Sequence, residues 1–132
     1  MDVRELLPQN KFDDSNMIKL FALSDDEIEP IIWELLTWLQ DFNWPIAPKI
    51  VTIIRAHDKL SEPHILSILK GTDEIWKYWI LTELLSEWPF RQYPDLLNEI
   101  NRIATRPTSN EIEEGLDEAA QKLMAGVIKC RA

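Results

Sequence analysis

The chain has 132 residues, of which 45% are hydrophobic and six are Trp, so it can bury the apolar core of one domain. Its 14 Lys and Arg are outnumbered by 23 Asp and Glu, which gives a formal net charge of −9. This excess of carboxylates argues against nucleic acids and anionic membranes as partners, because both are bound through basic surfaces. We therefore predict a single domain, residues 1–132, that binds neither.

The cysteine content and the N-terminal segment both bear on the compartment. Cys130 is the single cysteine, so no internal disulfide can form, which is typical of a reducing environment. Residues 1–8 lack the basic and then apolar pattern of a secretion signal, and no later stretch has about 18 uncharged apolar residues. These features predict a cytoplasmic protein without a membrane-spanning segment.

Signals for helix starts and ends recur along the first half of the chain, whereas hairpin signals are lacking. A short first helix is expected at residues 16–21. Ser24 and Glu27 have the spacing of a capping box for a second helix, which should end at Asp41–Asn43. Trp44-Pro45 is expected to open a third helix, because Pro is tolerated in a first turn.

The second half of the chain continues this helical pattern. Ser61–Pro63 should open a short fourth helix that Gly71 closes. Asp73 should cap a fifth helix over about residues 74–88, which has apolar groups on nearly every side and is therefore predicted to be the most buried.

The last predicted helices begin at Pro94 and at a second capping box, formed by Thr108 and Glu111. The final helix is expected to be long, and its carboxylates over residues 111–118 should form a solvated face. The whole chain is thus predicted to be all-α, with six to seven helices.

Shifting the chain on itself by about 30 residues aligns two helix pairs and places the turn at residues 41–43 on the turn at residues 71–73. The aligned apolar positions of the first pair are Leu35, Leu36, Trp38, Leu39, Ile46, Ile50, Val51 and Ile54; those of the second are Ile65, Leu66, Ile68, Leu69, Trp76, Ile80, Leu81 and Leu84. Such a pair cannot bury its faces alone, so the repeat predicts a compact stack of antiparallel helix pairs.

At these positions the sequence resembles the HEAT-repeat superfamily, whose units carry apolar residues before an Asp-bearing turn. The segments WPIA at residues 44–47 and IWKYWILTEL at residues 75–84 resemble the signature of a family of short, mostly bacterial domains of unknown function. The resemblance covers about residues 23–123. It implies a compact HEAT-like fold, an α-α superhelix, and no established activity.

No group of residues has the spacing of a metal, cofactor or nucleophile site, so no cofactor and no catalytic residue is predicted. His57 lies on an apolar stripe and is expected to be a partly buried imidazole with a satisfied hydrogen bond, and His64 is expected to face solvent.

Glu83 is the ionisable residue that draws most attention, because helical geometry puts it between Trp76 and Trp79. Two interpretations stay open. In the first, the carboxylate bonds to a cation such as Arg55 or Lys49, or to free amides at a helix start. In the second, it lines a groove and meets a cationic or amine-bearing ligand beside the Trp faces.

Equivalent positions of the second helices should recur on one face of a stack. We therefore predict a binding surface with Trp44, Trp76 and Glu83 near its centre and Asp41 and Asp73 on its rim. Among the remaining indoles, those of Trp38, Trp79 and Trp88 are expected in the core, and that of Trp33 is expected to show an edge to solvent.

These patterns favour a non-enzymatic protein-interaction module whose partner is another protein with a basic surface, for example as an acidic immunity-type inhibitor of a basic toxin. A small-molecule binder with a Trp/Glu cleft is the first alternative. A relative of HEAT-like DNA glycosylases is the second, and the net charge argues against it. The oligomeric state is left open.

Overall fold

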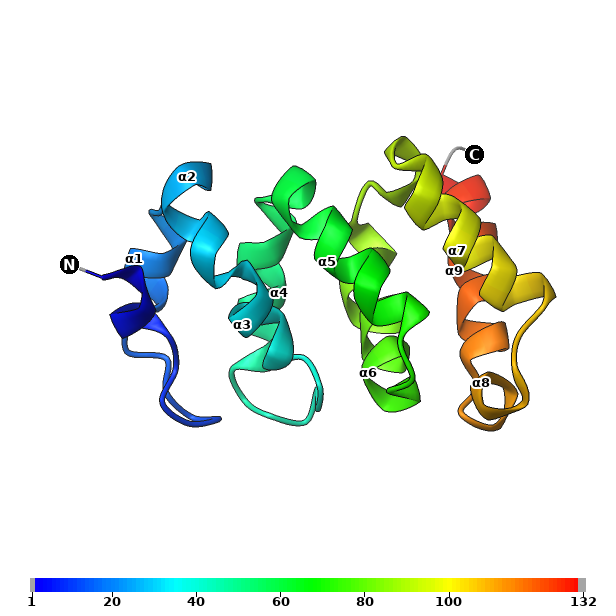
Figure 1. Ribbon diagram of the computed structural model, residues 1–132, viewed down its shortest axis with the longest axis horizontal. Helices are drawn as coiled ribbons and strands as arrows, with labels where there is room; N and C mark the ends of the chain where they lie inside the picture. Colours follow the sequence, from blue (N-terminus) through cyan, green and yellow to red (C-terminus); the bar gives the residue numbers. More distant parts are fainter. Residues whose placement is uncertain (1, 131–132) are drawn as a thin grey trace. The chain divides into compact units, whose positions relative to one another are not determined.

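The computed structural model describes residues 2–130, with side chains described up to residue 126. This part of the chain contains helices and turns but no strand, so the all-α prediction is confirmed (Figure 1). The chain divides into two compact units, Met1–Ser61 and Glu62–Ala132, and the division falls inside helix α5 (Asp58–Lys70). The prediction of a single domain stays a prediction.

Unit 1 is built from short helical segments. Their order is η1 (Val3–Leu6), α1 (Met17–Phe21), α2 (Asp25–Ile28), η2 (Glu29–Ile31), α3 (Ile32–Thr37) and α4 (Ala47–Arg55). The capping box of α2 is confirmed, since Ser24 Oγ accepts from the Glu27 N–H and Glu27 Oε1 accepts from the Ser24 N–H. The predicted second helix is nevertheless divided, because Pro30 lacks the N–H that would continue the α-helical bonds.

Helix α4 begins at Ala47, so the predicted start at Trp44-Pro45 was too early. The preceding residues are held in a turn, because Asp41 Oδ1 accepts from the Asn43 N–H at 2.9 Å and the Ile46 N–H donates to the Lys11 carbonyl at 3.2 Å. The side chains of Ile50, Ile53 and Ile54 on α4 are buried.

Unit 2 holds the remaining elements. After α5 these are α6 (Glu74–Trp79), the π-helix η3 (Ile80–Leu84), the 3-10 turns η4 (Leu85–Glu87) and η5 (Phe90–Gln92), α7 (Pro94–Thr105), α8 (Ser109–Glu113) and α9 (Leu116–Cys130). Helix α7 packs along α9 (Figure 1). The start of α7 at Pro94 is confirmed, whereas the predicted fifth helix is an α-helix only to Trp79 and then changes its winding.

Two other predicted boundaries were wrong. Helix α5 starts at Asp58 and contains Pro63, so Ser61 lies inside the helix, where its hydroxyl donates to the His57 carbonyl at 2.8 Å. The predicted long last helix breaks at Gly115, whose φ of 75° is a left-handed conformation that ends α8. The side chain of Cys130 lies outside the described residues.

The repeat detected in the sequence matches the pattern of burial. All the aligned positions of both helix pairs are buried except Trp38 and Leu66, which are half-buried. Trp88 lies in the core as predicted, but Trp79 is half-buried and the buried indole of α6 is that of Trp76. The exposed edge predicted for Trp33 is confirmed, at 39% exposure.

Among residues 2–130, no helix combines the length and the apolar character that crossing a bilayer would require.

Replacing Gly115 by Ala tests the break between α8 and α9. No atom would touch the added Cβ, so the left-handed backbone is the source of strain, and we expect a loss of about 1 kcal/mol in the free energy of unfolding. Gly126→Ala is the matched control, because its Cβ also meets nothing but lies within α9, where Ala stabilises by about 0.5–1 kcal/mol. Urea unfolding would measure both, and a stabilised Gly115→Ala variant would contradict the assignment.

Candidate functional site

Unit 2 contains a groove that is lined by α6, η3, α8 and α9. Its middle part has a volume of about 510 Å³. One wall comes from α6 and η3, through Ile75, Tyr78, Trp79 and Thr82. The other wall comes from α8 and α9, through Glu113, Glu114, Gly115, Glu118, Ala119 and Lys122. We call this feature, together with the two hollows that adjoin it, the α6–α9 groove.

The two adjoining hollows extend the groove at opposite ends. One, of about 450 Å³, shares Ile75, Glu113 and Glu114 with the middle part. It adds Thr72, Asp73, Glu74 and Asn110. The other, of about 410 Å³, shares Thr82, Ala119 and Lys122 with the middle part. It adds Leu81, Ser86, Leu123 and Gly126, and its lining is mostly apolar. The groove thus runs from an acidic end to an apolar end.

Helical phase explains which side chains of α6 face the groove. Ile75, Tyr78, Trp79 and Thr82 follow the i, i+3, i+4, i+7 spacing of one helix face. Tyr78 and Trp79 contact each other edge to face, with ring centroids 5.3 Å apart. Ile75 is 55% exposed, so the groove wall presents an aliphatic and two aromatic surfaces to solvent.

The π-helix η3 continues this wall beyond the end of α6. Thr82 Oγ1 donates to the Tyr78 carbonyl at 2.9 Å and occupies a position shared by the middle and apolar parts of the groove. A π turn widens the backbone spiral and recurs at functional sites in proteins.

A buried ion-pair network holds the helices behind the acidic end. Glu111 is 0% exposed, and its carboxylate accepts from both Arg102 terminal nitrogens, at 3.0 and 2.8 Å, and from Lys77 Nζ at 3.0 Å. Lys77 also contacts Glu74 at 3.3 Å, and Arg102 contacts Glu99 at 2.9 Å. The network therefore joins α6, α7 and α8.

The same carboxylate caps α8. Glu111 Oε1 accepts from the Thr108 N–H at 2.8 Å, and Thr108 Oγ1 accepts from the Glu111 N–H at 3.1 Å, so the predicted capping box is confirmed. The prediction that Glu111 belongs to a solvated acidic face was wrong, because a local capping signal does not reveal the two cations that bury it.

These contacts shift the pKa values of Glu111 and Arg102. Burial raises the pKa of the Glu111 carboxyl, but the hydrogen bonds from Arg102, from the Thr108 backbone and from Lys77 outweigh it and lower the pKa to about 2. The hydrogen bond to Glu111 raises the pKa of the Arg102 guanidinium above its usual range. Both groups are therefore charged at neutral pH.

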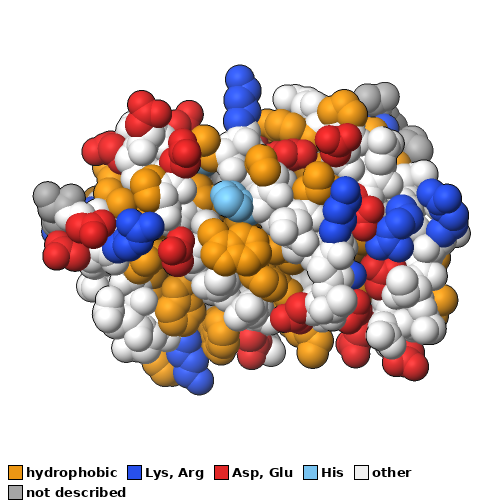
Figure 2. Space-filling model, viewed as in Figure 1, with side chains coloured by type: hydrophobic (Ala, Val, Ile, Leu, Met, Phe, Trp, Pro, Cys, Tyr) orange, Lys and Arg blue, Asp and Glu red, His pale blue; other side chains and the backbone are white. Residues whose placement is uncertain are grey.

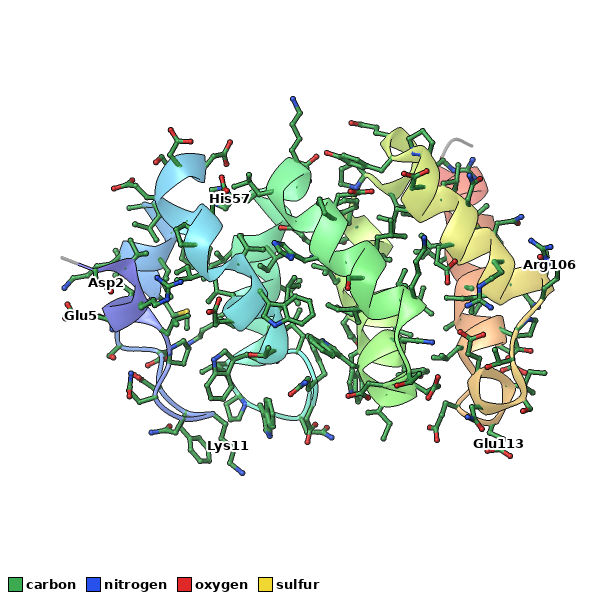
Figure 3. The ribbon with its side chains drawn as sticks, in the orientation of Figure 1. Asp2, Glu5, Lys11, His57, Arg106 and Glu113 are labelled. Carbon is green, nitrogen blue, oxygen red and sulfur yellow. The ribbon has the colours of Figure 1, made fainter. Side chains whose placement is uncertain are left out.

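The network adjoins the groove through a further hollow of about 490 Å³. This hollow shares Thr72, Glu74 and Asn110 with the acidic end, and it is lined by Lys77, Arg102 and Glu111. Figure 3 shows Glu113 on α8 and Arg106 beyond the end of α7. The basic residues of unit 2 are spread over several elements, with Lys77 on α6, Arg102 on α7 and Lys122 on α9.

Two of the predicted binding residues lie in unit 1. Trp44 is half-buried in the turn before α4 and meets Trp38 edge to face at 5.5 Å. Asp41 is half-buried, and its carboxylate supports the same turn through the Asn43 N–H. Both residues have a local structural role in that turn.

The other three lie in unit 2. Asp73 caps α6, because its carboxylate accepts from the Trp76 N–H at 3.1 Å, and it also lines the acidic end of the groove. Trp76 is only 8% exposed, so Trp79 supplies the indole of the groove wall. Glu83 is half-buried on η3, and both interpretations of its carboxylate stay open.

The histidine predicted to be partly buried is confirmed as such. His57 is 9% exposed, and its Nδ1 contacts Asp25 Oδ1 at 2.5 Å (Figure 3). Figure 2 shows acidic side chains gathered over α2, the helix that carries Asp25. Across the described side chains, no group of three or more His, Cys, Asp and Glu is placed to hold a metal ion.

Sequence reasoning missed Lys77 and Arg102. A signal for Lys77 was present, because a cation flanked by Trp76 and Tyr78 in a helix apolar on nearly every side must find a buried partner. Arg102 carried no such signal, since α7 is amphipathic and a cation on its polar face is ordinary.

A family described as Domain of unknown function (DUF5071) matches residues 6–124. The search of curated proteins finds no similar sequence.

Replacing Glu111 by Gln tests the network. Gln can keep the capping box but removes the charge that compensates Lys77 and Arg102, so we expect the free energy of unfolding to fall by about 3–5 kcal/mol. The control is Glu113→Gln at an exposed position of the same helix, with an expected change within about 0.5 kcal/mol. Equal stability of the two variants in urea unfolding would show that the network contributes nothing.

The lowered pKa of Glu111 also predicts a pH dependence. The folded value of about 2 lies below the ordinary value of 4.5, so the unfolded chain takes up this proton first as pH falls. The stabilisation is therefore complete above about pH 5 and is lost progressively toward pH 2. Urea unfolding between pH 7 and pH 3 should show a steeper loss of stability for the wild type than for Glu111→Gln, and parallel curves would contradict the assignment.

Proposed function

We propose that this chain, which belongs to the DUF5071 family, is a non-enzymatic protein-interaction module whose α6–α9 groove binds a Lys- or Arg-bearing segment of a basic partner protein. In this proposal its helix pairs stack as HEAT-like repeats, and it acts in the cytoplasm. An acidic immunity-type inhibitor of a basic toxin is one form that the function can take.

The observation that carries the proposal is the combination of surfaces in one groove. Tyr78 and Trp79 offer aromatic faces, and Glu113, Glu114 and Glu118 stand on the opposite wall. A Lys or Arg side chain can lay its apolar stem on the rings while its charge meets the carboxylates. Each cation–aromatic contact contributes roughly 0.5–2 kcal/mol.

The charge of the chain favours the same class of partner. A net charge of −9 attracts a basic protein over a distance and accelerates its encounter, with a strong dependence on ionic strength. The repeat of buried positions supports the stacked architecture, because helix pairs with matching apolar faces are stabilised by their neighbours. Trp44 and Asp41 remain candidate contact residues of unit 1.

A small-molecule binder is the second candidate, and the size of the groove favours it. The middle part, about 510 Å³, falls within the range of ligand pockets, which is roughly 300–1,000 Å³. A small cationic ligand that raises the melting temperature, without any protein partner, would favour this candidate.

Reversing charges in the groove tests the interaction. Glu113→Lys with Glu114→Lys leaves α8 intact, because cations suit the C-terminal end of a helix. Glu5→Lys with Glu29→Lys is the matched control on exposed positions of unit 1, and each double change moves the net charge from −9 to −5, since each Glu→Lys adds two. We expect the wild type and the control variant to capture the same proteins from cell extract, and the groove variant to fail to capture them.

A partner identified in this way can then be purified. We expect its dissociation constant to be about tenfold or more higher for the groove variant than for the wild type, and to rise further with added salt. Equal affinity of the groove and control variants for that partner would overturn the proposed role of the groove.

A further inference from the structure

The α6–α9 groove changes chemistry along its length. Its acidic end gathers Asp73, Glu74, Glu113 and Glu114, whereas its other end is lined by Leu81, Ala119 and Leu123. Lys122 is the single cation among the described residues that line the three parts of the groove, and it stands where the middle part meets the apolar end. A segment that satisfies both ends must therefore carry its charge and its apolar surface in separate halves.

We infer that the occupant of the groove is one helix of a basic partner, with its Lys and Arg side chains in the half over Asp73, Glu113 and Glu114 and apolar side chains in the half over Leu81 and Leu123. This inference rests on the proposed function and adds the length, conformation and charge order of the bound segment.

The length follows from the wall that α6, η3 and η4 provide. Residues from Asp73 at one end to Ser86 at the other line the groove. At about 1.5 Å per helical residue, this wall is roughly 20 Å long. A bound helix of about 13 residues, between three and four turns, would match it.

The conformation follows from the backbone of the walls. No strand occurs among residues 2–130, so the groove has no sheet edge to which an extended segment could add its hydrogen bonds. A helix satisfies its own backbone groups and needs only side-chain contacts, as in other grooves that bind helices.

The charge order follows from Lys122 and the carboxylates together. A Lys or Arg placed over the apolar end would lose its hydration beside Leu81 and Leu123 and would also be repelled by Lys122. The same side chain over the acidic end meets several carboxylates and the exposed aliphatic surface of Ile75. A second copy of this chain is a poor occupant, because each copy carries a net charge of −9.

Synthetic helical peptides of about 14 residues and identical composition test the inference. Two of them are block peptides, with all Lys residues in one half and all Leu residues in the other. One block peptide has the Lys half at its N-terminus and the other has it at its C-terminus, so that both directions of the bound helix are tested. In the third, Lys residues are spread along the whole polar face. Fluorescence anisotropy with the full chain should give a dissociation constant about tenfold lower for the better of the two block peptides than for the dispersed peptide.

Two variants of the full chain locate the effect. Glu113→Lys with Glu114→Lys should remove the preference for the block peptide, and the Glu5→Lys with Glu29→Lys control should keep it. Lys122→Glu, at an exposed position, should bring the dispersed peptide close to the block peptide by removing the repulsion at the apolar end.

Equal affinities of the block and dispersed peptides for the wild type, or no binding of any of them, would overturn the inference. If the groove variant still loses the natural partner in that case, the proposed function stands and only the helical, charge-ordered occupant is excluded. If the groove variant captures the partner normally, both fail.

Discussion

The buried carboxylate of Glu111 is the constraint on which unit 2 depends. It receives hydrogen bonds from Lys77 on α6 and from Arg102 on α7 while it caps α8, so one side chain fixes three helices. A buried charge is stable only when its partners are all in place, and removing any of them leaves another charge uncompensated. The positions of α6 and α8, and with them the acidic end of the groove, therefore depend on this network.

The groove itself depends on two departures from regular helix. Gly115 ends α8 in a left-handed conformation and lines the groove, so the carboxylates of α8 and those of α9 stand on separate helices around one hollow. On the other wall the π turn of η3 follows α6, and Thr82 within it lies where two parts of the groove meet. Both breaks in helical regularity thus lie in the wall of the groove, and π turns recur at functional sites in proteins.

Local signals in the sequence were sufficient for the fold class and for several boundaries. The capping boxes at Ser24 and Thr108 were correct, because both of their partners lie within three residues. The start of α5 was misplaced because Pro63 was taken for a first turn, although a helix of 13 residues tolerates it inside. The break at Gly115 inside the last predicted helix was missed, because a single Gly in the sequence can be either a helix cap or a weak helical position.

The candidate site was harder to predict, because it depends on contacts between distant helices. Trp76 was predicted at the binding surface and Trp79 in the core, whereas Trp76 is buried and Trp79 lines the groove. This choice depends on which face of α6 packs inward. That face is set by the pairing of Lys77 with Glu111, 34 residues along the chain. The sequence around Lys77 signals that this cation needs a buried partner, but no local pattern identifies Glu111 as that partner.

A double-mutant cycle between Lys77 and Glu111 tests the central claim most directly. The free energies of unfolding of the wild type, Lys77→Met, Glu111→Gln and the double variant give the coupling between the two side chains. If the network organises unit 2, the coupling is on the order of 1–3 kcal/mol, and the double variant is more stable than the sum of the single losses predicts. A coupling near zero would show that the two residues act independently and would contradict the account.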